Sequence, residues 1–216
     1  MKTAALIPAY NEEKRVAKVI ADVSRYVDKV IVLDDCSTDN TAEKARTAGA
    51  EVITNPKNLG YLKNIFNGIK KTEADILVTL DADGEHPAGR IPDLLEPIRK
   101  GEADLVLGRR RKIPRLSERI ISRLTCLKTG VKDAGTGLRA FRKSFTKGIS
   151  KKKGYCTCGV FVLFFHQRMA RIKEVSIREI PIEKPRGIAW RHIPQLFLVL
   201  WQIIASRRAE DRRPHV

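Results

Sequence analysis

Val78-Thr79-Leu80-Asp81-Ala82-Asp83-Gly84-Glu85-His86-Pro87 is the stretch that decides the fold of this 216-residue chain. The apolar residues that lead up to it predict a short buried strand, which ends in three acids at alternate positions, Asp81, Asp83 and Glu85. Gly84 permits a turn that would fold these carboxylates onto one point. Clustered carboxylates at a strand's carboxyl end suit a hard cation such as Mg²⁺ or Mn²⁺, and ligands bind at that edge of open α/β sheets. A solvated acidic turn is the alternative that the spacing alone leaves open.

Strands and helices alternate on both sides of this stretch. Strand patterns fall at residues 3–8, 29–33, 51–54, 76–80, 104–107 and 175–182, and helix patterns lie between them. The first helix is expected to open at Asn11, with two acids in its first turn, and to bury the i, i+3, i+4, i+7 stripe Val16, Val19, Ile20 and Val23. Repeated βαβ units predict an α/β fold with a mostly parallel sheet and helices on both faces.

Composition narrows the class of protein. The chain carries 42 Lys+Arg against 25 Asp+Glu, a formal net charge of +17, which attracts nucleic acid, an anionic membrane face or phosphorylated small molecules. The four cysteines, Cys36, Cys126, Cys156 and Cys158, form no CxxC pair, which disfavours a zinc site and is typical of reduced thiols in a cytoplasmic protein. No run reaches the roughly 18 apolar residues that span a bilayer, and no signal region precedes the first strand.

Polar motifs follow the first two strands. Ile-Pro-Ala-Tyr-Asn-Glu (residues 7–12) ends the first, where Tyr10 could stack on a base and Glu12 could bind ribose or base groups. Leu-Asp-Asp-Cys-Ser-Thr-Asp (residues 33–39) ends the second, where a carboxylate can bind ribose hydroxyls. Taken singly, the first motif is better explained by an ordinary strand-to-helix loop, and the second is explained equally well by a capping loop.

Five motifs in chain order, each at a predicted strand end or helix start, are together much more specific. They are Pro-Ala-Tyr-Asn-Glu (8–12), Asp-Asp-Cys-Ser-Thr-Asp (34–39), Asn-Leu-Gly-Tyr (58–61), Asp-Ala-Asp-Gly-Glu-His-Pro (81–87) and Gly-Arg-Arg (108–110). This order resembles the family 2 glycosyltransferases, whose fold is the Rossmann-like GT-A architecture. Residues 133–141 resemble that family's aspartate and glycine segment. Residues 175–182, with Arg186 and Gly187, resemble the end of its dolichol-phosphate mannosyltransferase branch.

The resemblance covers about residues 3–190 and implies a GT-A domain at residues 1–188. It implies an inverting, metal-dependent transfer of a mannose- or glucose-class sugar from a GDP- or UDP-sugar to a polyprenyl (dolichyl) phosphate. The residues that it assigns to the nucleotide sugar are Pro8, Tyr10, Glu12, Leu33, Asp35, Asp81, Ala82, Asp83, Arg109 and Arg186. It assigns Mg²⁺ or Mn²⁺ to Asp83 and Glu85, and catalytic roles to Asp81, Asp83, Asp133 and Arg139.

Asp133 has expected roles that depend on the acceptor. A hydroxyl acceptor needs a general base, and Asp133 is the candidate. A phosphate acceptor is already ionised near pH 7, so Asp133 could orient Arg139 instead. An aspartate that merely structures its loop is the third possibility. His86, beside the acids, is expected to be structural or to support the metal ligands.

The chain departs from the family pattern at several points. Glu85 stands where the mannosyltransferases commonly carry Gln, and Cys36 stands where the family commonly carries Gly. Without a Gln-x-x-Arg-Trp motif, a processive polysaccharide synthase is disfavoured. Two other classes are weighed: a sugar-phosphate nucleotidyltransferase, which would want a glycine-rich basic loop at residues 8–11, and a non-enzymatic basic protein on nucleic acid, for which no motif is present.

The last expected element is an amphipathic helix within residues 189–216, followed by a basic tail. Its apolar stripe is Ile193, Leu196, Phe197, Leu200, Trp201 and Ile204, widened by Leu198, Val199 and Ile203. With arginines at both ends, this helix suits an anionic membrane surface and is too short to span it. We therefore predict a peripheral enzyme at the inner, cytoplasmic face of the membrane, docked by this helix and by the basic segments 109–115 and 151–153. Packing on the sheet or on a second subunit is the alternative.

Overall fold

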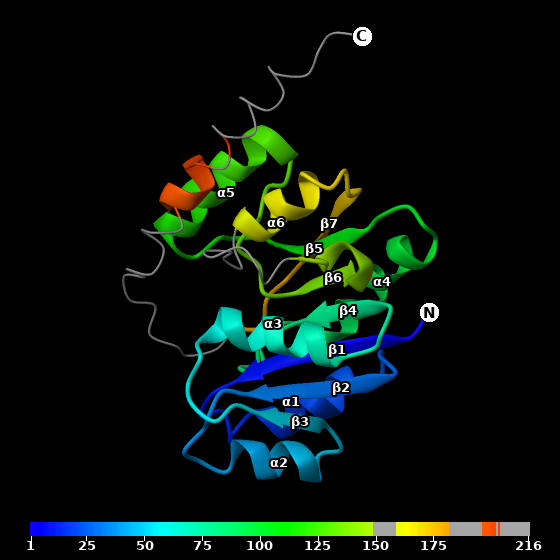
Figure 1. The fold of residues 1–216 in the computed structure, drawn as a ribbon, viewed down its shortest axis with the longest axis vertical. Helices are drawn as coiled ribbons and strands as arrows, with labels where there is room; N and C mark the ends of the chain where they lie inside the picture. Colours follow the sequence, from blue (N-terminus) through cyan, green and yellow to red (C-terminus); the bar gives the residue numbers. More distant parts are fainter. Residues whose placement is uncertain (149–158, 182–195, 202, 204–216) are drawn as a thin grey trace, which may run out of the picture.

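A seven-stranded sheet runs through the centre of the molecule (Figure 1). This computed structural model describes residues 1–148, 159–181, 196–201 and 203. The strand order across the sheet is β3-β2-β1-β4-β6-β5-β7. The strands are β1 (Thr3–Ala9), β2 (Lys29–Asp34), β3 (Glu51–Thr54), β4 (Ile76–Thr79), β5 (Leu105–Arg110), β6 (Arg139–Arg142) and β7 (Ile172–Ile177).

Parallel pairing dominates the sheet, as the repeated βαβ pattern predicts. β1 pairs in parallel with β2 and β4, β2 with β3, and β5 with β7. The sequence pattern does not predict β6, which runs antiparallel between β4 and β5. The prediction of a strand over residues 175–182 was wrong in its bounds: β7 lies earlier because it pairs with β5 from Ile172, opposite Leu105, onward.

Helices cover both faces of the sheet, also as predicted. They are α1 (Val16–Val23), α2 (Thr41–Thr47), α3 (Tyr61–Lys71), α4 (Ile91–Arg99), α5 (Leu116–Thr129), α6 (Gly159–His166) and the short 3-10 turns η1 (Ala88–Arg90) and η2 (Lys143–Thr146). One hydrophobic core joins α3, α5 and α6 to one face, and a second joins α1, α2 and α4 to the other. The fold is therefore a mostly parallel α/β sandwich of three layers.

The first helix starts later than the sequence predicts. Asn11 adopts a left-handed backbone with φ of +55°, so the chain turns before α1 begins at Val16. The Glu12 carbonyl accepts hydrogen bonds from the amides of Arg15 and Val16, and the first turn of α1 contains no acid. The predicted stripe of four buried apolar residues is confirmed. The acids are consequently free of the helix and belong to the loop at the end of β1.

The carboxyl-terminal helix, of which residues 196–201 and 203 are described, presents two apolar faces. Val199 is buried, and Leu196 and Ile203 pack with it against the core that contains α5 and α6. Phe197 and Trp201 point outward and are exposed. The single predicted stripe is therefore wrong for Leu196, which faces inward, while Ile193 and Ile204 lie outside the described residues. Within the described part of the chain, no helix is both long and apolar enough to cross a bilayer.

Candidate active site

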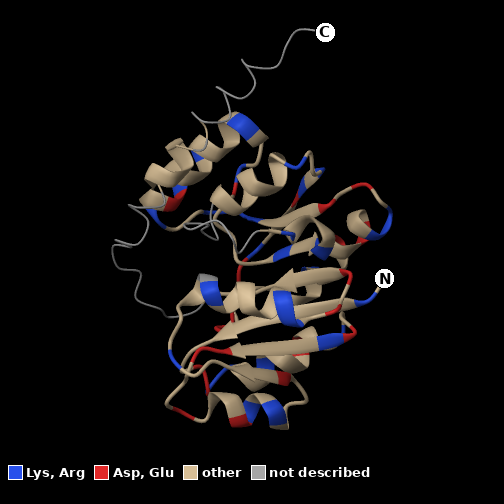
Figure 2. Cartoon of the chain, in the orientation of Figure 1, with Lys and Arg blue, Asp and Glu red and all other residues tan. Residues whose placement is uncertain are grey.

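The ends of β1 and β2 are joined into one polar platform. The Asp35 amide donates to the Ala9 carbonyl over 2.9 Å, and the Asn11 side-chain oxygen accepts from the Thr38 amide over 2.9 Å. Tyr10, between these contacts, leaves 49% of its surface exposed. Figure 2 shows acidic segments in the loops at this carboxyl edge of the sheet. The platform therefore presents an exposed aromatic ring beside fixed backbone, as the nucleoside prediction requires.

Asp35 is buried and holds the loop that precedes α3. Its Oδ1 accepts from Asn55 Nδ2 over 2.9 Å and from the Leu59 amide over 2.8 Å, and its Oδ2 accepts from the Gly60 amide over 2.8 Å. Gly60 has φ of +79°, a left-handed backbone that favours glycine. The structure thus brings the motif at residues 58–61 onto the motif at residues 34–39, which the sequence alone leaves separate.

Three residues assigned to the nucleotide sugar by resemblance lie differently from Tyr10. Pro8 is buried within β1, and the Leu33 side chain packs in the core against α3. The Leu33 carbonyl accepts from Asn64 Nδ2. Glu12 lies at the rim, with its Oε2 3.3 Å from Arg15 Nη1. A contact of Pro8 or Leu33 with a ligand would therefore have to use the backbone.

The acid loop follows β4 directly. Asp83 is only 5% exposed, whereas Asp81 and Glu85 are half-buried and Ala82 is buried. The Glu85 amide donates to Asp83 Oδ1 over 3.1 Å, and Gly84 takes the left-handed φ of +81° that the predicted turn needs. The Glu85 carbonyl accepts from the Ile180 amide, so the segment after β7 reaches this loop.

His86 closes the acid loop on its inner side. Its Nε2 lies 3.2 Å from Asp81 Oδ2. Burial lowers the pKa of His86, but the hydrogen bond with Asp81 and the charges of Asp81 and Asp83 outweigh burial, so the pKa lies above its ordinary value. A Cβ added at Gly137 would lie 2.6 Å from His86 Nε2 and 2.7 Å from Asp81 Oδ2, so any other residue there would displace these side chains. The buried Nδ1 of His86 has no hydrogen-bond partner among the described residues, and an ordered water or an ion is a usual partner of such a group.

The acid loop suits a cation that takes only part of its coordination from the protein and the rest from a bound ligand and water. Asp83 and Glu85 supply the hard oxygen donors that Mg²⁺ and Mn²⁺ prefer. Across the described ranges, no three His, Cys, Asp or Glu side chains group closely enough to form an all-protein metal cage. Mg²⁺ usually takes one or two carboxylates and completes its coordination with water and substrate phosphate. The donor set therefore agrees with the predicted pair of ligands.

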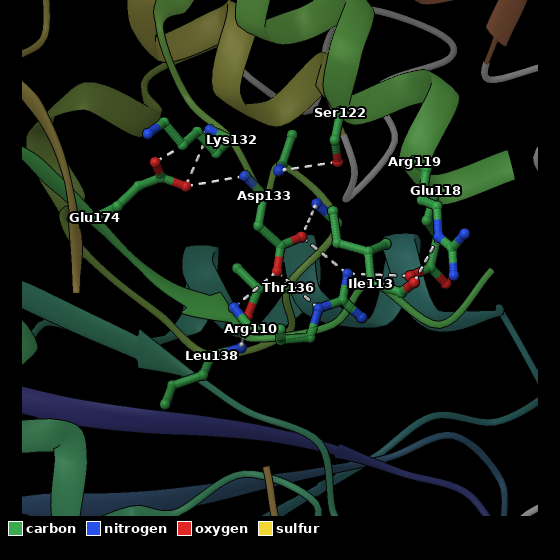
Figure 3. Close-up of polar contacts among 12 residues, drawn as sticks. Arg110, Ile113, Glu118, Arg119, Ser122, Lys132, Asp133, Thr136, Leu138 and Glu174 are labelled. Carbon is green, nitrogen blue, oxygen red and sulfur yellow. Dashed lines mark hydrogen bonds and ion pairs between the residues drawn. The ribbon is translucent and has the colours of Figure 1, made fainter. Parts of the chain in front are cut away.

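Asp133 has a different neighbour from the one predicted. Its carboxylate pairs with Arg110, Nε to Oδ2 over 2.8 Å and Nη2 to Oδ1 over 2.9 Å (Figure 3). The expectation that Asp133 orients Arg139 was wrong: Arg139 donates through Nε to the Thr136 carbonyl, and its guanidinium lies over the Phe161 ring. Arg139 is buried against α6 rather than extended toward the acid loop.

A strongly basic pocket of about 740 Å³ opens at the ends of β5 and β7. Arg109 Nη2 donates to Ser176 Oγ over 3.1 Å, and Arg90 Nη2 donates to the Ser176 carbonyl over 3.0 Å. The pocket is lined by Pro87, Arg90, Arg109, Arg110, Arg111, Ile113, Lys132, Ser176, Ile177 and Arg178, none of which is acidic. The motif at residues 108–110 and the basic segment 109–115 are found from the sequence, whereas Arg90, Lys132 and Arg178 are missed because they lie far from that segment along the chain.

Of the remaining predicted features, only some lie within the described residues. Arg186, the basic segment 151–153, Cys156 and Cys158 lie outside the described residues. Cys36 and Cys126 are free, half-buried thiols. Cys36 has a left-handed φ of +65°, which explains why the family commonly places Gly at this loop position.

Comparison with known proteins assigns the class. The family described as Glycosyl transferase family 2 matches residues 4–167, so the chain belongs to glycosyltransferase family 2. A UDP-N-acetylglucosamine–dolichyl-phosphate N-acetylglucosaminyltransferase of Methanococcus voltae is 32% identical over 82% of this chain and 85% of that protein. A dolichol-phosphate mannosyltransferase of Pyrococcus furiosus is 29% identical over 69% of this chain and 48% of that protein.

Solved structures confirm the GT-A fold. Glucosyl-3-phosphoglycerate synthase from Mycobacterium tuberculosis, in complex with phosphoglyceric acid, superposes with a TM-score of 0.76. It is 24% identical, over 92% of this chain and 78% of that one, and at this identity the likeness shows the fold alone. Family membership makes the protein a glycosyltransferase and sets aside the nucleotidyltransferase and nucleic-acid-binding alternatives.

Proposed function

We propose that this protein transfers a mannose- or glucose-class sugar from a GDP- or UDP-sugar to the phosphate of a polyprenyl phosphate, with inversion at the sugar. The observation that carries the proposal is a row of three features along one sheet edge. The platform with Tyr10 follows β1 and β2, the acid loop follows β4, and the basic pocket follows β5 and β7. In that row a donor that spans the first two features would meet an anionic acceptor in the third.

The donor half rests on the first two features. Tyr10 would stack on the base, and Asp83 and Glu85 would hold the metal against the diphosphate. A bound Mg²⁺ or Mn²⁺ neutralises charge that builds on the leaving nucleoside diphosphate. Structures of the mycobacterial synthase were obtained with Mn²⁺ and UDP-glucose, and the archaeal relative from Methanococcus voltae is named for a UDP-sugar donor. These names support a UDP-sugar as the first donor to test.

The acceptor half rests on the basic pocket. Arg109 and its basic neighbours attract a phosphate and would stabilise it without a proton transfer. A phosphomonoester is largely ionised at neutral pH, so it needs no general base. Both archaeal relatives are named for dolichyl or dolichol phosphate. This acceptor agrees with an Asp133 whose carboxylate is occupied by Arg110.

We further propose that the enzyme docks on the inner, cytoplasmic membrane face through the outward side of its carboxyl-terminal helix. Phe197, Leu200 and Trp201 are exposed on that side. Figure 1 shows this helix beside α5, whose outer face exposes Leu116, Ile120 and Leu127 next to Arg119 and Arg123. Apolar side chains interleaved with arginines suit an anionic lipid surface, where a polyprenyl phosphate presents its head group.

A donor panel tests the proposed activity. The full chain would be incubated with GDP-mannose, UDP-glucose and UDP-N-acetylglucosamine, each with Mn²⁺, with Mg²⁺ or with EDTA, and with polyprenyl phosphate in anionic vesicles. We expect one donor to give a sugar-phosphate lipid only with metal. Metal-independent transfer, or no lipid product from any donor, would contradict the proposal.

A further inference from the structure

Arg110 and Asp133 form a buried, bidentate ion pair (Figure 3). Only 8% of the Arg110 side chain and 1% of the Asp133 side chain are exposed. The two hydrogen bonds, 2.8 and 2.9 Å long, run parallel from the guanidinium to the two carboxylate oxygens. A planar guanidinium bound in this way fixes both the distance and the orientation of its partner.

Both oxygens of Asp133 also accept from the backbone. Oδ2 accepts from the Arg110 amide over 3.0 Å, and Oδ1 accepts from the Gly135 amide over 3.2 Å. An ionised carboxylate offers about four acceptor positions, and these two amides with the guanidinium fill them. A general base must instead present an oxygen to the proton that it removes. The contacts therefore favour a structural task for Asp133 over proton transfer.

The loop that begins at Asp133 forms a wall of the acid site. At its far end the Gly137 carbonyl accepts from Thr79 Oγ1 over 3.0 Å, and Gly137 lies so close to Asp81 and His86 that a Cβ would displace them. The other end of the loop, at Asp133 and Ala134, is held by three elements. Arg110 of β5 pairs with the Asp133 carboxylate, and Glu174 of β7 accepts from the Asp133 amide over 2.9 Å. Ser122 of α5 accepts from the Ala134 amide. A shift at Asp133 would therefore move Gly137, which lies against Asp81.

We propose that Arg110 and Asp133 are positioning residues for the transfer reaction, on whose assignment this inference rests. Their pair holds the loop at residues 133–138 so that Gly137 fixes Asp81 and His86 in one place. Glu118 of α5 supports the pair, because its Oε2 lies 3.0 Å from Arg110 Nη2. The charges of Asp133 and Glu118 outweigh burial and raise the pKa of Arg110, so the guanidinium stays charged.

The test replaces Arg110 and Asp133 first singly and then together. The kcat and donor KM of the full chain would be compared with those of Asp133→Leu, Arg110→Met and the double variant. Asp133→Leu leaves Arg110 with Glu118 as its remaining anion, and Arg110→Met leaves Asp133 with its two backbone amides, so each single variant unbalances a buried charge. The double variant removes both charges of the pair, and Glu118 keeps its ion pair with Arg115. We expect kcat/KM to fall about 100-fold in each single variant and to recover about ten-fold in the double variant. A folded double variant no more active than Asp133→Leu would overturn the proposal, because a reacting residue cannot be rescued by its neighbour.

Asp104 and Arg171, just before the same two strands, provide a control pair of the same geometry in which the arginine is more exposed, with 58% of the Arg171 side chain accessible. Arg171 binds Asp104 with the same two-pronged geometry, Nε to Oδ2 over 3.0 Å and Nη2 to Oδ1 over 2.9 Å, just before β5 and β7 begin. This pair lies at the opposite edge of the sheet from the acid loop. Its replacement by Leu and Met should lower stability and leave kcat/KM of the folded protein within about two-fold. An equal loss of kcat/KM in the control would show that any broken pair has this effect and would contradict a positioning role.

Asp133→Asn keeps the proposal testable where the leucine variants do not fold. Asn retains an acceptor oxygen but cannot act as a base, so we expect about a tenth of the kcat and an unchanged pH profile. A loss above about 1,000-fold in folded protein would overturn the proposal.

An inactive wild type would count against the proposed function instead. Amide hydrogen exchange at residues 81–86 would then decide: it should be faster in Arg110→Met than in Arg171→Met, and equal rates would contradict positioning.

Discussion

Asp35 and Asn55 share a hydrogen bond of 2.9 Å across the ends of the neighbouring strands β2 and β3. The same carboxylate binds the amides of Leu59 and Gly60, so one buried aspartate ties β2 to the loop before α3. The residue that the family resemblance assigns to the nucleoside is therefore also a structural centre of the platform. A donor that hydrogen-bonds Asp35 would have to share or displace one of these contacts.

Asp35→Ala should weaken nucleotide binding and also lower stability, because it removes a hydrogen-bond acceptor from Asn55 Nδ2 and from the amides of Leu59 and Gly60. We expect the free energy of unfolding to fall by about 1–3 kcal/mol in urea denaturation. Glu96→Ala, which removes an exposed ion pair with Lys100 on α4, is the control and should change little. Unchanged stability with lost binding would show that Asp35 serves the ligand alone.

Asp83→Asn should abolish metal-dependent binding of the nucleotide and leave the fold intact, because the side chain lies on a loop after β4. We expect the Kd for UDP in the presence of Mn²⁺ to rise by about 100-fold or more, measured by calorimetry. The matched control is Asp75→Asn, at the opposite end of the same strand, where the carboxylate caps the Lys2 amide. Full Mn²⁺-dependent binding by Asp83→Asn would rule out the proposed metal site.

Gly137→Ala should reduce turnover, because the added Cβ would displace Asp81 and His86. Gly137 does not have a left-handed φ, so the substitution should not strain the backbone. A displacement of reacting groups by about 1 Å typically lowers the rate about 100-fold. Gly89→Ala is the control, since its Cβ would meet only the Tyr26 hydroxyl at 3.8 Å. Steady-state kinetics on both variants provide the measurement, and equal activities would remove Gly137 from the wall of the site.

Replacement of Phe197, Leu200 and Trp201 by Ser should weaken recovery of the full chain on anionic liposomes, because these side chains would enter the lipid interface. Val199 stays in place, so the helix keeps its buried contact with the core. The control is Met169→Ser, which removes an exposed apolar side chain after α6. Flotation at low and high salt is the measurement, and equal recovery of all proteins would remove the helix from the docking surface.

Local patterns carried most of the fold prediction. The runs before Asp35 and Asp81 are apolar over the length of a buried strand, and Val16 to Val23 repeat with the period of a helix, so parallel βαβ units follow. β6 could not be predicted, because its four residues form a strand only where β4 and β5 supply partners on both sides.

The predictable part of the site is the part that strand ends define. Tyr10, Asp35, Asp81 and Asp83 lie at the same edge of the sheet because the parallel strands that precede them end there. The partners of Asp133 and Arg139 depend on how distant segments pack: α6 takes Arg139 against Phe161, which leaves Arg110 to pair with Asp133. Arg90 and Arg178 likewise join Arg109 only through the pairing of β5 with β7.

The most direct test of the account compares two acceptors that differ only in their phosphate. The full chain would be given the active nucleotide sugar, Mn²⁺ and anionic vesicles with either polyprenyl phosphate or the corresponding polyprenol, and the anomeric configuration of the product would be determined. We expect transfer to the phosphate alone, with the configuration inverted relative to the donor and no covalent sugar–enzyme species. Transfer to the polyprenol, or a product that retains the donor's configuration, would contradict it.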